Sequence, residues 1–314
     1  MKYLLSIDGG GTKTEFCISD FEGENIKLFS TGCSNYKSVG IEGLYLSLKE
    51  GFDWIKETLS IDTEDIAYGV FGISGCDSEN DYEIIKQQIL NNGIKKDKIY
   101  LCNDGILAFY AQADEPGLVV ISGTGSIVIG LDEKGNYKRS GGWGYNISDI
   151  GSGYWIGNEA LRRTLLYCDN CYSHSLLFDE IMKYFKAKDF QELPYKITEI
   201  TDYFEIAKIA EIVLAMAQQG EAEAYSILEQ GAQALADLAK STYDKLNFNE
   251  ETDINIVFSG GVLKNRIYEE NLKASIGRKI KLDHITFLVQ ENPPSYGGIK
   301  LAKTILGRGG CNDT

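Results

Sequence analysis

One local pattern occurs twice in this chain: an apolar strand, a glycine-rich turn with hydroxyl side chains, and a second apolar strand. The first copy, IDGGGTKTEFCI, spans residues 7–18, and the second, ISGTGSIVIGL, spans residues 121–131. Apolar runs on both sides of a glycine turn predict a hairpin. Two such units indicate two related lobes within one chain, although glycine hairpins also recur by chance.

The rest of the chain alternates between short apolar strands and segments with helical periodicity. This alternation predicts an α/β fold in which mixed sheets are covered by helices. The expected strands are 3–7, 16–19, 25–30, 66–73, 98–101, 118–121, 127–131, 254–258 and 284–289. The expected helices are 43–59, 82–91, one that starts at 103–104, 154–167, 176–185, 204–217, 222–246, one after residue 265, and 295–306.

Charge excludes several classes of partner. The 314 residues include 31 Lys and Arg against 46 Asp and Glu, a formal net charge of −15. Such a chain repels nucleic-acid phosphates and anionic lipid, so we expect neither nucleic acid nor membrane as a partner. There is no run of about 18 apolar residues to span a bilayer, and the first apolar stretch is too short for a signal peptide. We therefore expect a cytoplasmic protein.

The seven cysteines show no disulfide pattern, and an odd number without a signal peptide predicts free thiols. One local cluster, Cys168, Cys171 and His174, has the spacing of metal ligands. No second cysteine pair completes it, so incidental packing is the preferred interpretation. Cys311 is expected to be free like the others.

Three glycine-rich loops follow three apolar strands, at residues 8–14, 122–126 and 259–264. Glycines let backbone N–H groups approach an anion, and Thr or Ser hydroxyls add further donors. Two facing hairpins of this kind would hold a polyphosphate from both sides, and a third loop would hold the nucleoside. The chain has neither a P-loop motif nor a dinucleotide-binding glycine motif at the first strand.

The segments DGGGTKT, ISGTGS and FSGGVLKN, in this order and spacing, resemble the phosphate and adenosine motifs of the actin-like sugar kinase/Hsp70 ATPase superfamily. Three further segments are similar to the N-acetylglucosamine kinase branch of the BadF/BadG/BcrA/BcrD ATPase family. They are Ser34-Asn35-Tyr36, Asn103-Asp104 and the block GGWGYNISDIGSGYWIG at 141–157. The resemblance covers essentially the whole chain.

This resemblance implies a two-lobed, actin-like ATPase fold of the ribonuclease H-like type, with duplicated mixed sheets and a cleft between the lobes. The N-terminal lobe would be 1–115 plus a closing helix at 295–310, and the C-terminal lobe 116–294. The implied reaction is phosphorylation of N-acetylglucosamine and N-acetylmuramic acid at the 6-hydroxyl, with ATP and Mg²⁺, in cell-wall sugar salvage. A monomer and a homodimer both stay open.

The resemblance also assigns roles to individual residues. Asp104 would be the general base that accepts the proton of the sugar hydroxyl, although Asp at this point also suits a helix N-cap. Asp8 would hold Mg²⁺ through water. The other nucleotide contacts would be Gly10, Gly11, Thr12, Lys13, Thr124, Gly125, Gly260, Gly261 and Lys264. The sugar contacts, besides Asp104, would be Asn35, Tyr36, Gly142, Trp143, Gly144 and Asp149.

Several alternatives remain at this point. Lys37 would pair with the lactyl carboxylate of N-acetylmuramate, or else be a solvated charge. Core packing is an alternative for Trp143 and is preferred for Trp155. A strict N-acetylglucosamine or glucosamine kinase is the nearest functional alternative. An ATPase that activates a CoA dehydratase or reductase is the alternative of another class, but Cys76 and Cys102 lie in no recognisable cluster motif.

Overall fold

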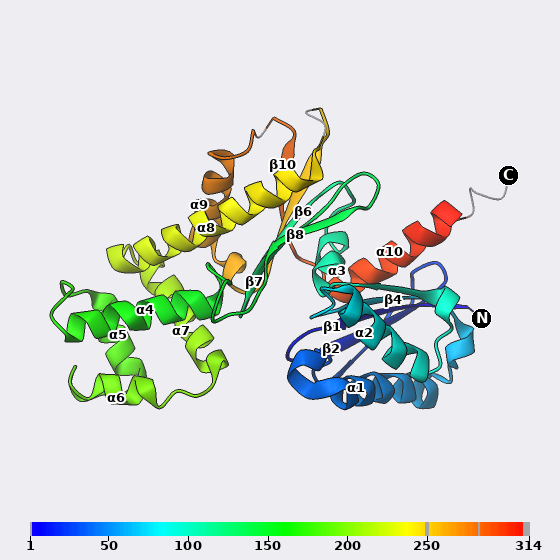
Figure 1. Cartoon of the computed structure of the whole chain (residues 1–314), viewed down its shortest axis with the longest axis horizontal. Helices are drawn as coiled ribbons and strands as arrows, with labels where there is room; N and C mark the ends of the chain where they lie inside the picture. Colours follow the sequence, from blue (N-terminus) through cyan, green and yellow to red (C-terminus); the bar gives the residue numbers. More distant parts are fainter. Residues whose placement is uncertain (1, 249–250, 282, 310–314) are drawn as a thin grey trace. The chain divides into compact units, whose positions relative to one another are not determined.

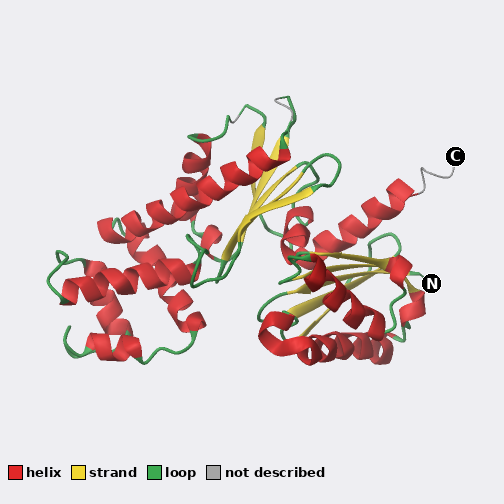
Figure 2. Cartoon of the chain, viewed as in Figure 1, coloured by secondary structure: helices red, strands yellow, loops and turns green. Residues whose placement is uncertain are grey.

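The structure is a computed structural model that describes residues 2–248, 251–281 and 283–309 (Figure 1). Its contacts divide the chain into two compact units. One unit contains the residues up to Asp114 together with those from Gln290 onward, and the other is Glu115–Val289. Each unit has its own sheet, whose strands are yellow in Figure 2, and its own apolar core.

The first unit is built on a five-stranded mixed sheet. Its strands are β1 (Tyr3–Gly9), β2 (Thr14–Asp20), β3 (Lys27–Thr31), β4 (Ile66–Ile73) and β5 (Ile99–Cys102), in the order β3-β2-β1-β4-β5. β2 runs antiparallel to both neighbours, whereas β1, β4 and β5 are mutually parallel. The parallel strands therefore bring their carboxyl ends to one edge of the sheet.

Helices cover both faces of this sheet (Figure 1). They are α1 (Tyr36–Leu59), α2 (Glu79–Asn91), α3 (Asp104–Tyr110) and α10 (Pro294–Gly309). Side chains alternate along β1, so that Leu5 and Ile7 join the core under α1 and α2, while Ser6 faces α10. Gly298 permits that approach, because a Cβ there would lie 2.0 Å from Ser6 Oγ. The last helix thus packs on the first unit.

The second unit repeats the same sheet. Its strands are β6 (Gly117–Ser122), β7 (Ser126–Leu131), β8 (Tyr137–Gly141), β9 (Ile254–Ser259) and β10 (Ile285–Val289). The order β8-β7-β6-β9-β10 and all strand directions match those of the first sheet. Its helices are α4 (Gly153–Cys168), α5 (Leu176–Tyr184), α6 (Leu193–Thr198), α7 (Tyr203–Gln218), α8 (Ala222–Leu246) and α9 (Arg266–Gly277).

The repetition extends to the turn after the second strand of each sheet. Asp20 Oδ1 accepts hydrogen bonds from the amides two and four residues later, at 3.1 and 2.8 Å. Asp132 Oδ1 accepts the equivalent two bonds at 2.9 and 2.8 Å. Gly23 and Gly135 take positive φ at the same place in the two turns. The predicted α/β fold with duplicated mixed sheets is confirmed.

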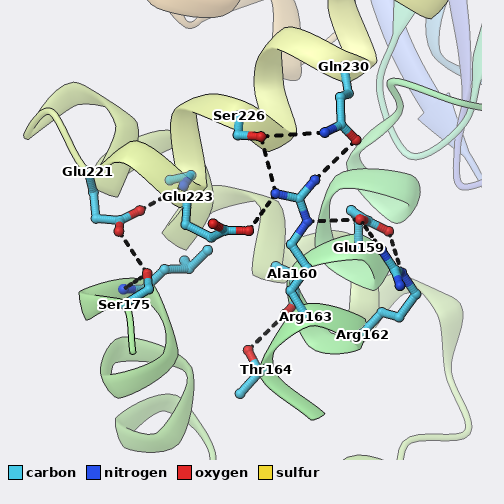
Figure 3. Close-up of polar contacts among 12 residues, drawn as sticks. Glu159, Ala160, Arg162, Arg163, Thr164, Ser175, Glu221, Glu223, Ser226 and Gln230 are labelled. Atoms are coloured by element: carbon cyan, nitrogen blue, oxygen red, sulfur yellow. Dashed lines mark hydrogen bonds and ion pairs between the residues drawn. The ribbon is translucent and has the colours of Figure 1, made fainter. Parts of the chain in front are cut away.

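A buried charge network joins α4 to α8 in the second unit (Figure 3). The Arg163 side chain is 4% exposed. Its guanidinium donates to Glu159 on α4 at 2.8 Å and to Glu223 on α8 at 2.6 Å. It also donates to Ser226 at 3.3 Å and to Gln230 at 3.1 Å. Because every partner is hydrogen-bonded, this buried cation fixes α4 against α8.

Some elements differ from the sequence-based expectation. β8 and α6 were not predicted, because YKRSG and LPYKIT show no clear apolar period. α1 starts at Tyr36 rather than at residue 43, since Asn35 caps it and a kink at Gly40, with φ of 75°, is accommodated within it. Residue 310 of the predicted closing helix and Cys311 lie outside the described residues. No described helix has the length and apolarity needed to cross a membrane.

Candidate functional site

The first glycine loop joins β1 to β2 at the carboxyl edge of the first sheet. Its base is fixed by a hydrogen bond from Gly10 N to Lys13 O at 2.9 Å and by one from Thr14 Oγ1 to Gly32 O at 2.8 Å. Gly11, Thr12 and Lys13 at its tip are exposed. Lys13 Nζ lies 3.0 Å from Glu15 Oε2. A fixed base with an exposed tip suits a loop that presents N–H and hydroxyl donors to an anion.

Two carboxylates lie at the same edge of the sheet as this loop. Asp8 lies near the end of β1, and Asp104 is the first residue of α3, directly after β5. Burial raises the pKa of Asp8 to about 8, and repulsion from Asp104 and Glu15 adds to the effect. Burial also raises the pKa of Asp104 to about 6, with a contribution from the charge of Asp77. Carboxylates that repel each other in this way fit a site for a divalent cation.

The N-cap of α3 is Asn103 and not Asp104, for which the sequence had left this role open. Asn103 Oδ1 accepts the hydrogen bond from Gly105 N at 3.0 Å and so caps α3. The Asn103 amide donates to Asp77 Oδ1 at 3.2 Å. Asp104 therefore occupies the first turn of a helix whose start is fixed by Asn103, which holds its carboxylate at the edge of the sheet.

Two acidic residues that the sequence analysis did not single out lie beside the predicted sugar residues. Asp81 contacts Tyr36 OH through a short hydrogen bond and Lys37 Nζ at 3.1 Å. Asp77 Oδ2 lies 3.6 Å from the same Lys37 Nζ. Burial would raise the pKa of Asp81, but hydrogen bonds led by that from Tyr36 hold it below its usual range. The polar run after β4 was the available signal for these two residues.

Asn35 and Tyr36 thus have structural partners in the first unit. Asn35 Oδ1 accepts from Lys37 N at 3.1 Å and caps α1, and the Asn35 amide donates to Ser74 Oγ at 3.4 Å. Ser74 N in turn donates to Gly9 O at 2.7 Å. These contacts link the start of α1, the end of β4 and the first glycine loop. Asn35 is therefore linked through Ser74 to the first glycine loop, whereas Tyr36 contacts Asp81 at the start of α2.

The second glycine loop, between β6 and β7, rests on the N-terminus of α4. Gly153 N donates to Gly123 O at 2.7 Å, and Tyr154 N donates to Thr124 O at 3.2 Å. Gly125 O accepts from Gly123 N at 3.0 Å across the turn. The position of Thr124 and Gly125 therefore depends on where α4 begins.

The third glycine loop meets the second one. Gly260 follows β9 with φ of 99°, and a Cβ there would lie 2.3 Å from Ser122 O. Glycine is required at this position by both conformation and space. Gly261 and Lys264 are exposed beside it, at the turn that leads to α9. The predicted nucleotide residues of the second unit thus gather at the carboxyl ends of β6 and β9.

The 142–149 loop adjoins the same place. Asp149 is buried and accepts from Gly144 N at 3.2 Å and from Ser148 Oγ at 3.0 Å. A Cβ on Gly125 would lie 2.5 Å from Asp149 Oδ2, so the loop touches the second glycine loop. Gly142 and Gly144 have positive φ.

The two tryptophans of residues 141–157 differ in burial: Trp143 is exposed, whereas Trp155 is partly buried. The Trp143 side chain is 69% exposed, which excludes the core position left open by the sequence. The Arg139 guanidinium lies over its ring at 4.2 Å. Trp155 packs against the core, as preferred. An exposed aromatic ring beside buried Asp149 offers an apolar face and a polar group to a sugar.

The Cys168, Cys171 and His174 cluster has local partners. His174 Nε2 lies 3.0 Å from Asp179 Oδ2, and its ring packs against Tyr167. Cys171 is exposed and Cys168 packs against the core. Across the described residues, no three His, Cys, Asp or Glu side chains are grouped to hold a metal ion.

Comparisons with known proteins agree with this arrangement. The model of the BadF/BadG/BcrA/BcrD ATPase family matches residues 5–289. The chain is 31% identical over 275 residues to the N-acetyl-D-glucosamine kinase of Dictyostelium discoideum, which covers 84% of this chain and 86% of that protein. It is 29% identical over 308 residues to the N-acetylmuramic acid/N-acetylglucosamine kinase of Clostridium acetobutylicum, covering 97% and 99%.

A solved structure has the same fold. The crystal structure of a candidate N-acetylglucosamine kinase from Chromobacterium violaceum superposes with a TM-score of 0.76 at 22% identity. The match covers 96% of this chain and 99% of that one. At this level of identity the match establishes the fold.

Proposed function

Because this chain belongs to the BadF/BadG/BcrA/BcrD ATPase family, we propose that it transfers the γ-phosphoryl group of ATP to the 6-hydroxyl of N-acetylated amino sugars. The predicted family and the predicted enzyme class are confirmed: the chain is an ATP-using sugar kinase that acts on amino sugars. The proposal adds the position of phosphorylation, the choice of sugar and a role in cell-wall sugar salvage. Its cytoplasmic location stays a prediction, and the choice between monomer and homodimer stays open.

The observation that carries the proposal is the placement of Asp104. Its carboxylate lies at the carboxyl edge of a sheet, beside the first glycine loop, on a helix start fixed by Asn103. We assign it as the general base. As the 6-oxygen attacks the γ-phosphorus, its proton passes to Asp104, the bond from phosphorus to the ADP oxygen breaks, and the sugar 6-phosphate forms. A positioned base contributes about 10²–10⁴-fold to such a reaction.

The glycine loops are assigned to the nucleotide. Backbone N–H groups of Gly10, Gly11 and Thr12 in one unit, and of Thr124 and Gly125 in the other, would donate to phosphate oxygens. Gly260, Gly261 and Lys264 are assigned to the adenosine side. Asp8 would hold Mg²⁺ through water, and the bound ion would neutralise charge on the phosphates. The raised pKa of Asp8 supports this assignment, since a bound cation would favour the charged carboxylate that burial and the nearby negative charges disfavour.

The sugar residues are proposed to be Asn35, Tyr36, Gly142, Trp143, Gly144 and Asp149. Acceptance of both N-acetylglucosamine and N-acetylmuramate is supported by the similarity to the Clostridium acetobutylicum kinase over nearly the whole chain. Lys37 is not assigned to the lactyl carboxylate, because Asp77 and Asp81 already pair with it. A strict N-acetylglucosamine or glucosamine kinase stays the alternative.

Coupled ADP release, measured over a panel of sugars, tests the proposal. The panel is N-acetylglucosamine, N-acetylmuramate, glucosamine, glucose and N-acetylmannosamine. We expect sugar-dependent ADP release with the first two, and phosphorus NMR of the product identifies the phosphorylated oxygen. Absence of sugar-dependent release across the panel would contradict the kinase assignment.

Asp104→Asn tests the base. We expect turnover to fall at least about a hundredfold while ATP binding is retained, because the amide cannot accept the proton. Asp53→Asn is the matched control, since Asp53 is half-exposed on α1 and pairs with Lys49, four residues before it on the same helix. Unchanged turnover in Asp104→Asn would remove Asp104 from the role of base.

A further inference from the structure

An aromatic stack connects the 142–149 loop to α7, a helix that no sequence motif linked to the site. The Tyr145 ring is stacked on the Tyr203 ring, with centroids 4.3 Å apart and planes 12° from parallel. Tyr154 meets the Tyr145 ring edge-on at 4.9 Å. We propose that Tyr203 is a positioning residue, which holds the 142–149 loop in the conformation that binds the sugar. This inference rests on the proposed function.

The loop needs an anchor of this kind. Its glycines at 142 and 144 have positive φ, and Trp143 and Ile147 are 69% and 79% exposed. Most of its hydrogen bonds join loop residues to one another, such as Trp143 N to Ser148 Oγ at 2.9 Å. Bonds within a loop fix its shape but leave its placement on the protein to other contacts. The Tyr145 ring, between Tyr154 and Tyr203, supplies such a contact.

Tyr203 is itself on a rigid support. Asp202 caps α7 by accepting from Phe204 N at 2.9 Å. One turn later, α7 lies directly against α4, because Gly157 has no side chain: a Cβ there would lie 2.0 Å from Ile206 O. The N-terminal end of α7 is therefore fixed to the N-terminal half of α4, which also supports the second glycine loop.

Through this stack, Tyr203 of α7 packs against Tyr145 of the proposed sugar loop. Loss of the stacked aromatic pair would lower the ratio of ordered to disordered loop by about two- to tenfold. Since only the ordered loop would bind sugar, the apparent sugar affinity falls by up to the same factor. The nucleotide residues Thr124 and Gly125 are held by backbone bonds at the start of α4 that do not involve Tyr203, so ATP affinity is expected to change less than sugar affinity.

Steady-state kinetics of Tyr203→Ala, Tyr203→Leu and Tyr203→Phe tests the inference. We expect the KM for N-acetylglucosamine to rise between about twofold and tenfold in the Ala and Leu variants. Phe keeps the ring and should restore a wild-type value. The Leu variant keeps apolar volume at this position in case the Ala variant does not fold. Tyr195→Ala is the control, because Tyr195 on α6 is 73% exposed.

The results separate this inference from the proposed function. If the wild type releases no ADP with any sugar, the proposed function fails and this inference fails with it. If the wild type is active but the sugar KM is unchanged in both Ala and Leu variants, only the role of Tyr203 is overturned. An equal rise in the KM values for sugar and ATP, or a Phe variant that behaves like the Ala variant, also overturns it.

Discussion

At the scale of single residues, the charged forms of Asp8 and Asp104, at the edge of the first sheet, are disfavoured in the ligand-free protein. Asp8 and Asp104 are both held in buried surroundings that raise their pKa values, and each feels other negative charges. A folded protein that holds such groups gives up stability in exchange for a binding site. The stability of the ligand-free protein should therefore depend on pH in a way that reports on Asp8.

Asp8→Asn is expected to stabilise the ligand-free protein at neutral and higher pH. The folded pKa of about 8 is above the ordinary value near 4. Between these values the folded state binds more protons than the unfolded state, so the free energy of unfolding falls as pH rises through this window. The variant removes this loss, and its melting temperature at pH 8 should exceed that of the wild type by about 1–3 °C.

Differential scanning fluorimetry from pH 5 to 8.5, without nucleotide or Mg²⁺, measures the effect. Asp20→Asn is unsuitable as a control, because Asp20 accepts hydrogen bonds that order a turn. Asp53→Asn is suitable, since Asp53 is half-exposed on α1. A melting temperature for Asp8→Asn that follows the wild type across the whole pH range would contradict the assigned cause of the shift.

Residues of this kind differ in how far the sequence predicts them. Asp8 and Asp104 follow apolar strands within recognisable motifs, so their places at the sheet edge were predictable. Asp77 and Asp81 follow β4 in a polar run without a motif, and their contacts with Lys37 arise only when α1 and α2 come together. Tyr203 lies 58 positions from Tyr145, and no spacing rule connects them.

At the scale of the elements, α4 supports the second glycine loop at its N-terminus and is itself fixed to α8 by Arg163. Its N-terminus donates to the loop carbonyls, and Arg163 in its C-terminal half joins it to α8 (Figure 3). The sequence predicted α4 and α8 from their apolar periods, with errors of one residue at most. It did not predict the network, because a charged residue within an amphipathic helix is normally solvated.

Arg163→Met is expected to lower the free energy of unfolding by about 3 kcal/mol, because it leaves Glu159 and Glu223 without their buried cation. Arg162→Met is a closely matched control. Arg162 is adjacent and pairs with the same Glu159, but its side chain is 54% exposed. It should cost less than about 1 kcal/mol. Urea unfolding measures both, and equal losses would show that burial does not decide the contribution of Arg163.

At the scale of the whole molecule, the two units are not equivalent in chain connectivity. The second unit is one continuous segment, Glu115–Val289, with a complete sheet and core. The first needs α10 from the other end of the chain, with Gly297 and Gly298 against α3 and β1. Removing the residues after 289 should therefore affect the first unit far more than the second.

A fragment of residues 115–289 is expected to fold alone, with helical circular dichroism and cooperative unfolding. A fragment of residues 1–114 should not, because the face of β1 that carries Ser6 would lose its cover. Both are measured by urea titration followed by circular dichroism. Non-cooperative unfolding of 115–289 would contradict the independence of the second unit.

The net charge of −15 also belongs to this scale. An acidic protein that binds ATP needs local donors, since exposed charges are screened beyond about 8 Å at physiological salt. The three glycine loops are proposed to supply such donors through backbone N–H groups, which carry no formal charge. The acidic composition and the frequent glycines of this sequence are therefore compatible with one function.

The matching turns at Asp20 and Asp132 indicate how the two units are related in evolution. Each follows the second strand of its sheet, at the end opposite to the glycine loop, so neither turn is shaped by a phosphate. Two halves that had converged on a common ligand would agree at the loops and have no reason to agree here. The same carboxylate-to-amide bonds in both turns therefore point to descent from a single ancestral half that was joined to a copy of itself.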